Sequence, residues 1–272
     1  MDSFGERGTP WRRILIRSGR RPRLFFGRLG SLAWLGFECL RALVRLRRPH
    51  LGIVYQTARN QVRFTALDAL PLVTLTGLLL GGVTLLQVVG QLSVYGGEEY
   101  LSRLMALLVV RELGPLLVAV LVVGRSGTAI AAEMASMKLD REVDSLYATG
   151  VDPITYLLVP RILGSITSLL VLVVLFDLVA LVGGFVVASF QLPLSFRLYL
   201  NALGAAIGPR ELVGGFLKGV AFGTAIPLIS AHSGLRVQGS STEIPQAVTR
   251  AAMESMVAIF VLGTIVSVVC YG

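Results

Sequence analysis

Two ionisable residues, Arg111 and Glu112, stand side by side within a long apolar run of this 272-residue chain. The run begins near Leu101, so at about 1.5 Å per residue the pair lies roughly 15–17 Å from its start. That depth is near the middle of a hydrocarbon layer about 30 Å thick. An ionised side chain costs roughly 2.5–3.5 kcal/mol there, so both residues must face a cavity, a partner helix or a ligand.

Two interpretations of this pair stay open. Adjacent residues point about 100° apart on a helix, so Arg111 and Glu112 do not simply pair with each other. They either line the polar part of a transport cavity or form a charge network that only fixes helix packing. Gly114 and Pro115 follow at once, and a proline inside a helix removes a hydrogen bond and bends the helix. Such a bend fits a cavity and fits packing equally well.

Three further charges interrupt other parts of the apolar sequence. Asp177 and Lys218 are single charges, which we predict toward the outer ends of their runs. Their default interpretation is a side chain that reaches the membrane interface, and the rival is a role along a lipid path. Arg125 lies near the inner end of its run, where we expect a structural pairing with an acid such as Glu133.

A stripe of small residues follows the charged pair. Its members are Gly124, Gly127, Ala131 and Ala135. Spacings of three and four residues place them on one helix face, and small residues let two membrane helices approach closely. We therefore predict a helix–helix contact along this stripe.

The segment 138–148, KLDREVDSLYA, is predicted to form a short helix between two apolar runs. Its charged rim consists of Asp140, Arg141, Glu142 and Asp144. Its apolar face consists of Val143, Leu146 and Tyr147, which recur at helical spacing. Such a helix either docks in a groove of a soluble partner or merely turns the chain, and the pattern alone does not decide between the two.

The composition indicates which elements must position these residues. Hydrophobic residues make up 54% of the chain and charged residues 15%, against roughly 25% charged residues in soluble domains. The apolar runs reach or approach the ~20 residues that span a bilayer, and they are continuous, which argues against a β-barrel. We predict an all-α polytopic membrane protein with five transmembrane helices. Their expected ranges are 69–92, 101–135, 156–190, 212–231 and 249–271, with a short outer helix at 196–206.

The N-terminal quarter carries the excess positive charge. Fourteen arginines and three acidic residues give residues 1–66 a net charge of +11, which leaves −2 for the remainder of the total of +9. Positive charge beside a first span stays cytoplasmic, near anionic lipid. We therefore predict a cytoplasmic N-terminus, an outer C-terminus and no nucleic-acid partner. The expected divisions are a basic cytoplasmic tail (1–24), interfacial or elbow helices (25–68) that begin with an amphipathic helix, and a five-span domain (69–272).

The usual sequence signatures of catalysis are absent. There is no G-x-x-x-x-G-K-[ST] loop for nucleotide phosphates, no G-x-S-x-G elbow and no H-E-x-x-H zinc motif. His232 is far in sequence from the only other histidine, His50, so we predict no metal site. We expect no catalytic residue, no enzymatic activity and no cofactor in this chain itself. From the embedded charges alone, an ATP-independent carrier or channel remains an alternative.

Several motifs, taken together and in order, resemble the MlaE permease family. They are RELGP at 111–115, GRSGTAIAAE at 124–133, the M-K-x-x-x-E-V-D-x-L pattern at 137–146, GVDPITYLLVPR at 150–161 and VTRAAMES at 248–255. The resemblance extends from about Asn60 to the C-terminus, whereas the basic N-terminal tail is particular to this chain.

The resemblance implies a fold, partners and a location. Such permeases have an interfacial N-terminal helix and five spans, and they form a homodimer at the centre of an ABC transporter in the bacterial inner membrane. The transporter moves phospholipids or related lipids between the inner and outer membranes. A separate cytoplasmic ATPase chain holds ATP and Mg²⁺, and a ring of MCE-domain protein lies on the periplasmic side.

The resemblance also implies roles for particular residues. The segment 138–148 corresponds to the coupling helix that docks on the ATPase. Arg111, Glu112 and Lys218 correspond to buried charges near the lipid pathway, and Pro115 belongs to the same motif as the first two. This chain departs from the family at Gly263, where many members carry an acid.

Overall fold

The computed structural model describes residues 41, 51–95, 104, 106–190 and 195–272. The predicted tail 1–24 and, apart from Arg41, the predicted N-terminal amphipathic helix lie outside the described residues. Within the described ranges the chain forms helices joined by short turns, and no strand occurs there.

Five helical stretches of the described chain are long and apolar enough to cross a membrane. They are Gln56–Gln87, Leu107–Leu139, Ile154–Val187, Pro209–Leu235 and Ser241–Tyr271. The prediction of an all-α polytopic membrane protein with five spans is confirmed.

The first span begins earlier than the sequence suggested. Three elements follow one another without a break: α2 (Leu51–Ala66), η2 (Leu67–Ala69) and α3 (Leu70–Tyr95). The apolar stretch already starts at Gln56, within α2. Arg59 and Arg63 lie exposed on α2 and make its sequence look polar, while α2 also packs against α8 (Val159–Ser189).

The second span contains two π-helical segments. Its segments are η3 (Ala106–Leu113), α5 (Gly114–Val122), η4 (Val123–Gly127) and α6 (Thr128–Leu139). η3 and η4 are π-helical, and π-helical turns within α-helices are frequent at functional sites. Arg111 and Glu112 lie in η3, and Pro115 stands in the first turn of α5. The predicted bend at Pro115 is therefore a local change of pitch within a continuous helical stretch.

The remaining elements complete the bundle. They are α7 (Glu142–Ala148), η5 (Ile154–Leu158), α8, α9 (Phe196–Ala206), α10 (Pro209–Leu235), η6 (Ser241–Glu243) and α11 (Ile244–Tyr271). α9 has the bounds predicted for the short outer helix. The turn between the last two spans is shorter than predicted, because Val237 is buried beside Ala135 and Ala247 and holds the chain close to the bundle.

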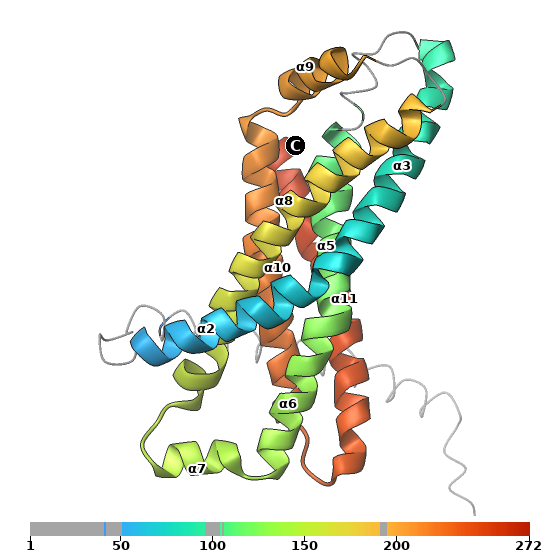
Figure 1. The fold of residues 1–272 in the computed structure, drawn as a ribbon. Coiled ribbons are helices and arrows are strands. Elements are labelled where there is room, and N and C mark those ends of the chain that lie inside the picture. Colours follow the sequence, from blue (N-terminus) through green and yellow to red (C-terminus); the bar gives the residue numbers. More distant parts are fainter. Residues whose placement is uncertain (1–40, 42–50, 96–103, 105, 191–194) are drawn as a thin grey trace, which may run out of the picture.

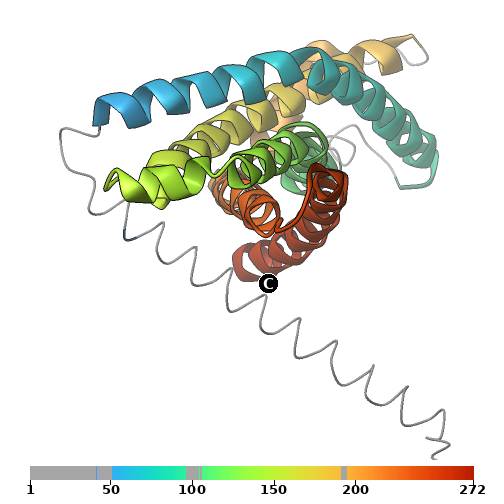
Figure 2. The same ribbon diagram turned by 90° about the horizontal axis from the view of Figure 1, so that it is seen from below.

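α8 is the central helix of the bundle. It contacts α2, α3, α5 and α10, and its side chains Leu169, Leu172 and Phe176 are fully buried. α2 and α3 lie on one side of it, and α10 and α11 lie on the other (Figure 2). α7 lies across one end of the bundle, here named the α7 end, whereas α9 and the C-terminus lie toward the opposite α9 end (Figure 1).

Aromatic packing fixes α9 on the end of α8. The rings of Phe196 and Tyr199 lie 5.0 and 5.2 Å from that of Phe185, between ring centroids. The Tyr199 hydroxyl donates a hydrogen bond to the carbonyl oxygen of Leu181 at 3.2 Å. Burial raises the pKa of Tyr199 to about 12, so this hydroxyl keeps its proton and remains a donor at neutral pH.

Candidate functional site

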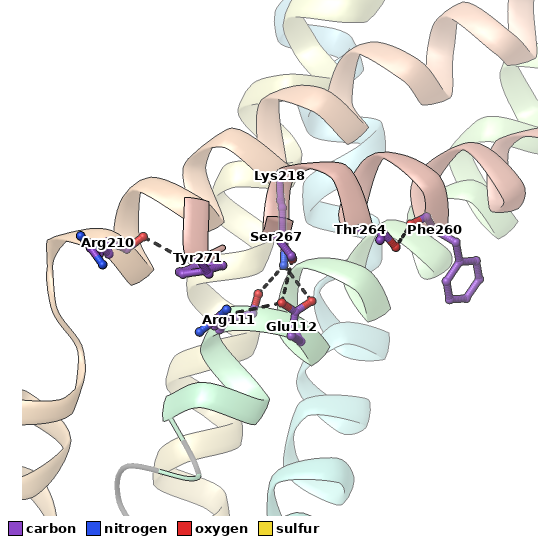
Figure 3. Close-up of polar contacts among 8 residues, drawn as sticks. All are labelled: Arg111, Glu112, Arg210, Lys218, Phe260, Thr264, Ser267 and Tyr271. Carbon is purple, nitrogen blue, oxygen red and sulfur yellow. Dashed lines mark hydrogen bonds and ion pairs between the residues drawn. The ribbon is translucent and has the colours of Figure 1, made fainter. Parts of the chain in front are cut away.

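Lys218 connects α10 to the charged turn of the second span. Its side chain is fully buried, with a residue exposure of 1%. Its Nζ donates hydrogen bonds to Oε2 of Glu112 at 2.9 Å and to the carbonyl oxygen of Arg111 at 2.6 Å (Figure 3). The default interpretation of Lys218 as an interfacial side chain that reaches water is therefore wrong, because its ammonium group binds inside the bundle.

Pro115 gives a physical reason for the bond to the backbone. Proline has no N–H, so Pro115 cannot donate to the carbonyl oxygen four residues earlier, which belongs to Arg111. A buried carbonyl without a donor is destabilising, and Lys218 supplies the donor. The bend and the buried lysine are thus two parts of one arrangement.

α11 completes the polar site with two residues that the sequence analysis did not single out. The Ser267 hydroxyl donates to Oε1 of Glu112 at 2.8 Å, and the Arg111 guanidinium carbon lies 3.3 Å from the centroid of the Tyr271 ring. Such stacking of a cation on an aromatic face is attractive. Thr264, Ser267 and Tyr271 recur every three or four residues in an otherwise apolar span, and this polar stripe is the signal that could have identified them.

Arg111 and Glu112 are less separated than their positions on a helix suggested. The Nε atom of Arg111 lies 3.8 Å from Oε1 of Glu112, because the long arginine side chain can fold back along its own helix. Arg111 also stacks on Tyr271, the last helical residue of α11. The guanidinium is therefore nearer to the α9 end of the spans than the estimate of a mid-membrane depth predicted.

A pocket of about 550 Å³ adjoins these side chains. Leu116, Phe222, Phe260 and Val268 give it apolar walls. Gly263 also lines it, and a Cβ there would lie 3.3 Å from the Phe222 ring. Among the side chains that line it, Arg111 and Lys218 are cationic and Glu112 is anionic. This combination of a cationic group and apolar walls suits an amphiphile with an anionic headgroup.

The ion pairs nearer the α7 end differ from the predicted ones. Arg125 pairs with Asp68 at 2.8 Å, and Glu133 pairs with Arg161 at 2.7 Å. The predicted pair of Arg125 with Glu133 is therefore wrong. Arg125 and Glu133 are eight residues apart on one helix, which separates them by more than two turns. Asp68 of η2 instead lies beside Arg125, and Arg161 of α8 lies beside Glu133.

Three residues of the predicted small-residue stripe lie in helix contacts. Gly127 faces Ser230 and Ile226 of α10, and Ala131 and Ala135 are fully buried. Gly124 is exposed, and a Cβ there would meet no atom within 4 Å. The contact therefore begins one turn later than the spacing predicted, because Gly124 belongs to the π-helical η4, whose residues per turn differ from those of an α-helix.

The segment 138–148 forms a turn and a helix. α6 ends at Leu139, Arg141 adopts a positive φ of 58°, and α7 begins at Glu142. Val143 is buried, and Leu146 is partly buried against the same apolar cluster. These two residues therefore pack under the bundle and are not part of an exposed apolar face. Tyr147 is 62% exposed.

The charged rim of this segment faces outward. The exposed members are Asp140, Arg141, Glu142 and Asp144. Lys138 bridges to Asp144 at 3.1 Å across the turn. The exposed surface of α7 thus combines charged side chains with Ser145, Tyr147 and Ala148.

The model of the family described as permease MlaE matches residues 58–269. The chain belongs to the MlaE permease family. The match begins two residues inside the first span, ends two residues before the end of α11 and confirms the predicted resemblance. Arg111, Glu112, Lys218 and Ser267 lie within it, whereas Tyr271 lies just beyond it.

Curated relatives of this MlaE-family chain include bacterial and plant proteins. A probable ABC transporter permease protein of Rickettsia felis is 30% identical over 89% of this chain and 92% of its own length. The intermembrane phospholipid transport system permease protein MlaE of Haemophilus influenzae is 28% identical over 91% of this chain and 94% of its own. The chloroplastic protein trigalactosyldiacylglycerol 1 of Arabidopsis thaliana is 27% identical over 79% of this chain and 61% of its own length. The MlaE-family chain is therefore a multi-pass membrane protein of the ABC transporter permease type.

Proposed function

We propose that this chain is the membrane subunit of an ABC transporter that moves phospholipids, or related lipids, between the inner and outer membranes of a bacterium. The Haemophilus influenzae relative is named for intermembrane phospholipid transport, which supports the substrate class. In this proposal the chain lies in the inner membrane as a homodimer. Its N-terminus and the α7 end face the cytoplasm, and its C-terminus and α9 face the periplasm.

The pocket beside Arg111 is the observation that carries the proposal. Ligand pockets commonly measure about 300–1,000 Å³ and combine apolar walls with a few polar groups. Here the apolar walls suit acyl chains, and the guanidinium of Arg111 suits a lipid phosphate. Lys218 neutralises Glu112 and supports the backbone of the turn, so Arg111 remains the cation that faces the headgroup.

ATP hydrolysis belongs to another chain in this proposal. A separate cytoplasmic ATPase binds ATP and Mg²⁺, and this chain carries no cofactor of its own. The exposed Tyr147 and the charged rim of α7 form the surface on which the ATPase docks. A ring of MCE-domain protein receives or delivers lipid at the α9 end.

Reconstitution tests the proposal. Transfer of fluorescent phosphatidylglycerol is measured in proteoliposomes that hold the chain alone or the chain with its ATPase and MCE partners. We expect ATP-dependent transfer only in the full complex, and roughly a tenfold or larger loss with Lys218→Met, because hydrogen bonds to charged groups are worth about 1.5–3 kcal/mol. Arg59→Met on the exposed face of α2 is the control and should leave transfer unchanged. Equal transfer by the chain alone would instead support an ATP-independent carrier.

A further inference from the structure

Asp177 of α8 is an acid within the third span that the site described above does not use. Its Oδ1 atom is buried and has no hydrogen-bond partner among the described residues. It does not line the pocket beside Arg111. A buried polar atom without a partner is unfavourable, so an acid at this place calls for an explanation.

The Asp177 carboxyl group lies directly against Gly114. A Cβ added to Gly114 would overlap with Oδ1 of Asp177, and it would also lie 3.1 Å from the carbonyl oxygen of Val109. No residue larger than glycine fits position 114 while the carboxyl group stays in place. The Asp177 carboxyl group of α8 thus fills the space that a side chain at Gly114 of the RELGP motif would need.

The contact lies behind the charged turn. Gly114 follows Glu112 by two residues, which places it roughly 200° around the helix from Glu112. Lys218 of α10 binds Glu112 and the Arg111 carbonyl from the pocket side. α8 and α10 both contact η3, so the turn is held between Lys218 on one side and Asp177 on the other.

We propose that Asp177 is a positioning residue that acts through Gly114 to hold Arg111 and Glu112 in the orientation that binds an anionic lipid headgroup. The inference rests on the proposed function of the pocket. Asp177 does not touch the lipid itself. Binding sites depend on groups held close to the productive geometry by their neighbours, and a short, flat carboxyl group fills the space at Gly114 that a smaller side chain would leave empty.

A double-mutant cycle tests the contact. Binding of dioctanoyl phosphatidylglycerol is measured on the full chain in phosphatidylcholine nanodiscs, after size-exclusion chromatography has selected folded protein. We expect Asp177→Ala and Gly114→Ala each to weaken binding roughly tenfold, since contacting residues are energetically coupled. The double variant should return to within about threefold of the unmodified chain, because the alanine methyl group at 114 occupies the space of the removed carboxyl group.

Two further variants separate positioning from general packing. Asp177→Asn keeps the size of the side chain and should bind within about threefold of the unmodified chain. Leu178→Ala changes an exposed neighbour on α8 and should have no effect. Additive losses in the double variant, or unchanged binding in Asp177→Ala, would overturn the inference.

The Lys218→Met variant, measured in the same titration, tests the proposed function independently of Asp177. If the unmodified chain prefers phosphatidylglycerol to phosphatidylcholine and Lys218→Met abolishes the preference, the proposed site stands whatever the Asp177 variants do. If the unmodified chain shows no such preference, the proposed headgroup site fails, and the role of Asp177 fails with it.

Discussion

A single ammonium group serves two acceptors on the second span. Lys218 balances the charge of Glu112 and donates to the carbonyl that Pro115 leaves without an N–H. We expect Lys218→Met to lower the free energy of unfolding by about 1.5–3 kcal/mol, because it removes two hydrogen bonds of a charged donor, to Glu112 and to the Arg111 carbonyl. Unfolding in detergent, followed by circular dichroism, measures the change.

Neutralising Glu112 provides the matched control for this prediction. In Glu112→Gln/Lys218→Met the carboxylate that faced the ammonium group is also removed, so part of the lost stability should return. Headgroup binding should remain impaired, because the Arg111 carbonyl still lacks its donor. If the double variant is less stable than Lys218→Met, charge pairing is not what the lysine supplies.

The sequence could identify the charged turn but not its partners. Arg111 and Glu112 stand out because ionised residues are rare in apolar spans. Lys218 and Ser267 are 106 and 155 residues away from Glu112, and helical periodicity does not tell which helix faces which. The predicted pair of Arg125 and Glu133 was wrong for the same reason, since both real partners come from other elements.

At the scale of elements, apolar length predicted the five spans well, whereas their ends and tight contacts needed the structure. α3 and α8 approach each other closely at Gly81, where a Cβ would overlap with the Ala180 carbonyl. Gly124, which the sequence placed in a contact, faces open space. Small residues in a sequence indicate that a close helix–helix contact is possible. Only the three-dimensional arrangement shows which small residues lie in such a contact.

These two glycines make a matched pair of substitutions. Gly81→Ala should lower the free energy of unfolding by about 1–3 kcal/mol or more, because α3 and α8 must separate to admit the methyl group. Gly124→Ala should be neutral or stabilise by up to about 1 kcal/mol, since alanine favours helix over glycine. Thermal unfolding of both variants measures the difference, and equal effects would contradict the close α3–α8 contact.

At the scale of the whole molecule, one helical stretch joins the two functional ends. Leu107–Leu139 contains the charged turn near the α9 end and leads into α7 at the opposite end (Figure 1). Val143 anchors α7 under the bundle. A displacement of α7 by a bound ATPase would therefore reach the pocket through packed helices, and rigid helices are one means by which distant sites are coupled.

Substitutions at Tyr147 and Val143 distinguish the docking of the ATPase on α7 from the packing of α7 against the bundle. Exposed tyrosines are frequent sources of binding energy at interfaces, so Tyr147→Ala should weaken ATPase association roughly tenfold without changing the stability of the chain. Val143→Ala should instead lower stability by about 1 kcal/mol or more, because it removes buried methyl groups. Co-purification with the ATPase and unfolding of the isolated chain measure the two effects. Unchanged association in Tyr147→Ala, with α7 intact, would show that the ATPase binds elsewhere and that motion cannot enter through α7.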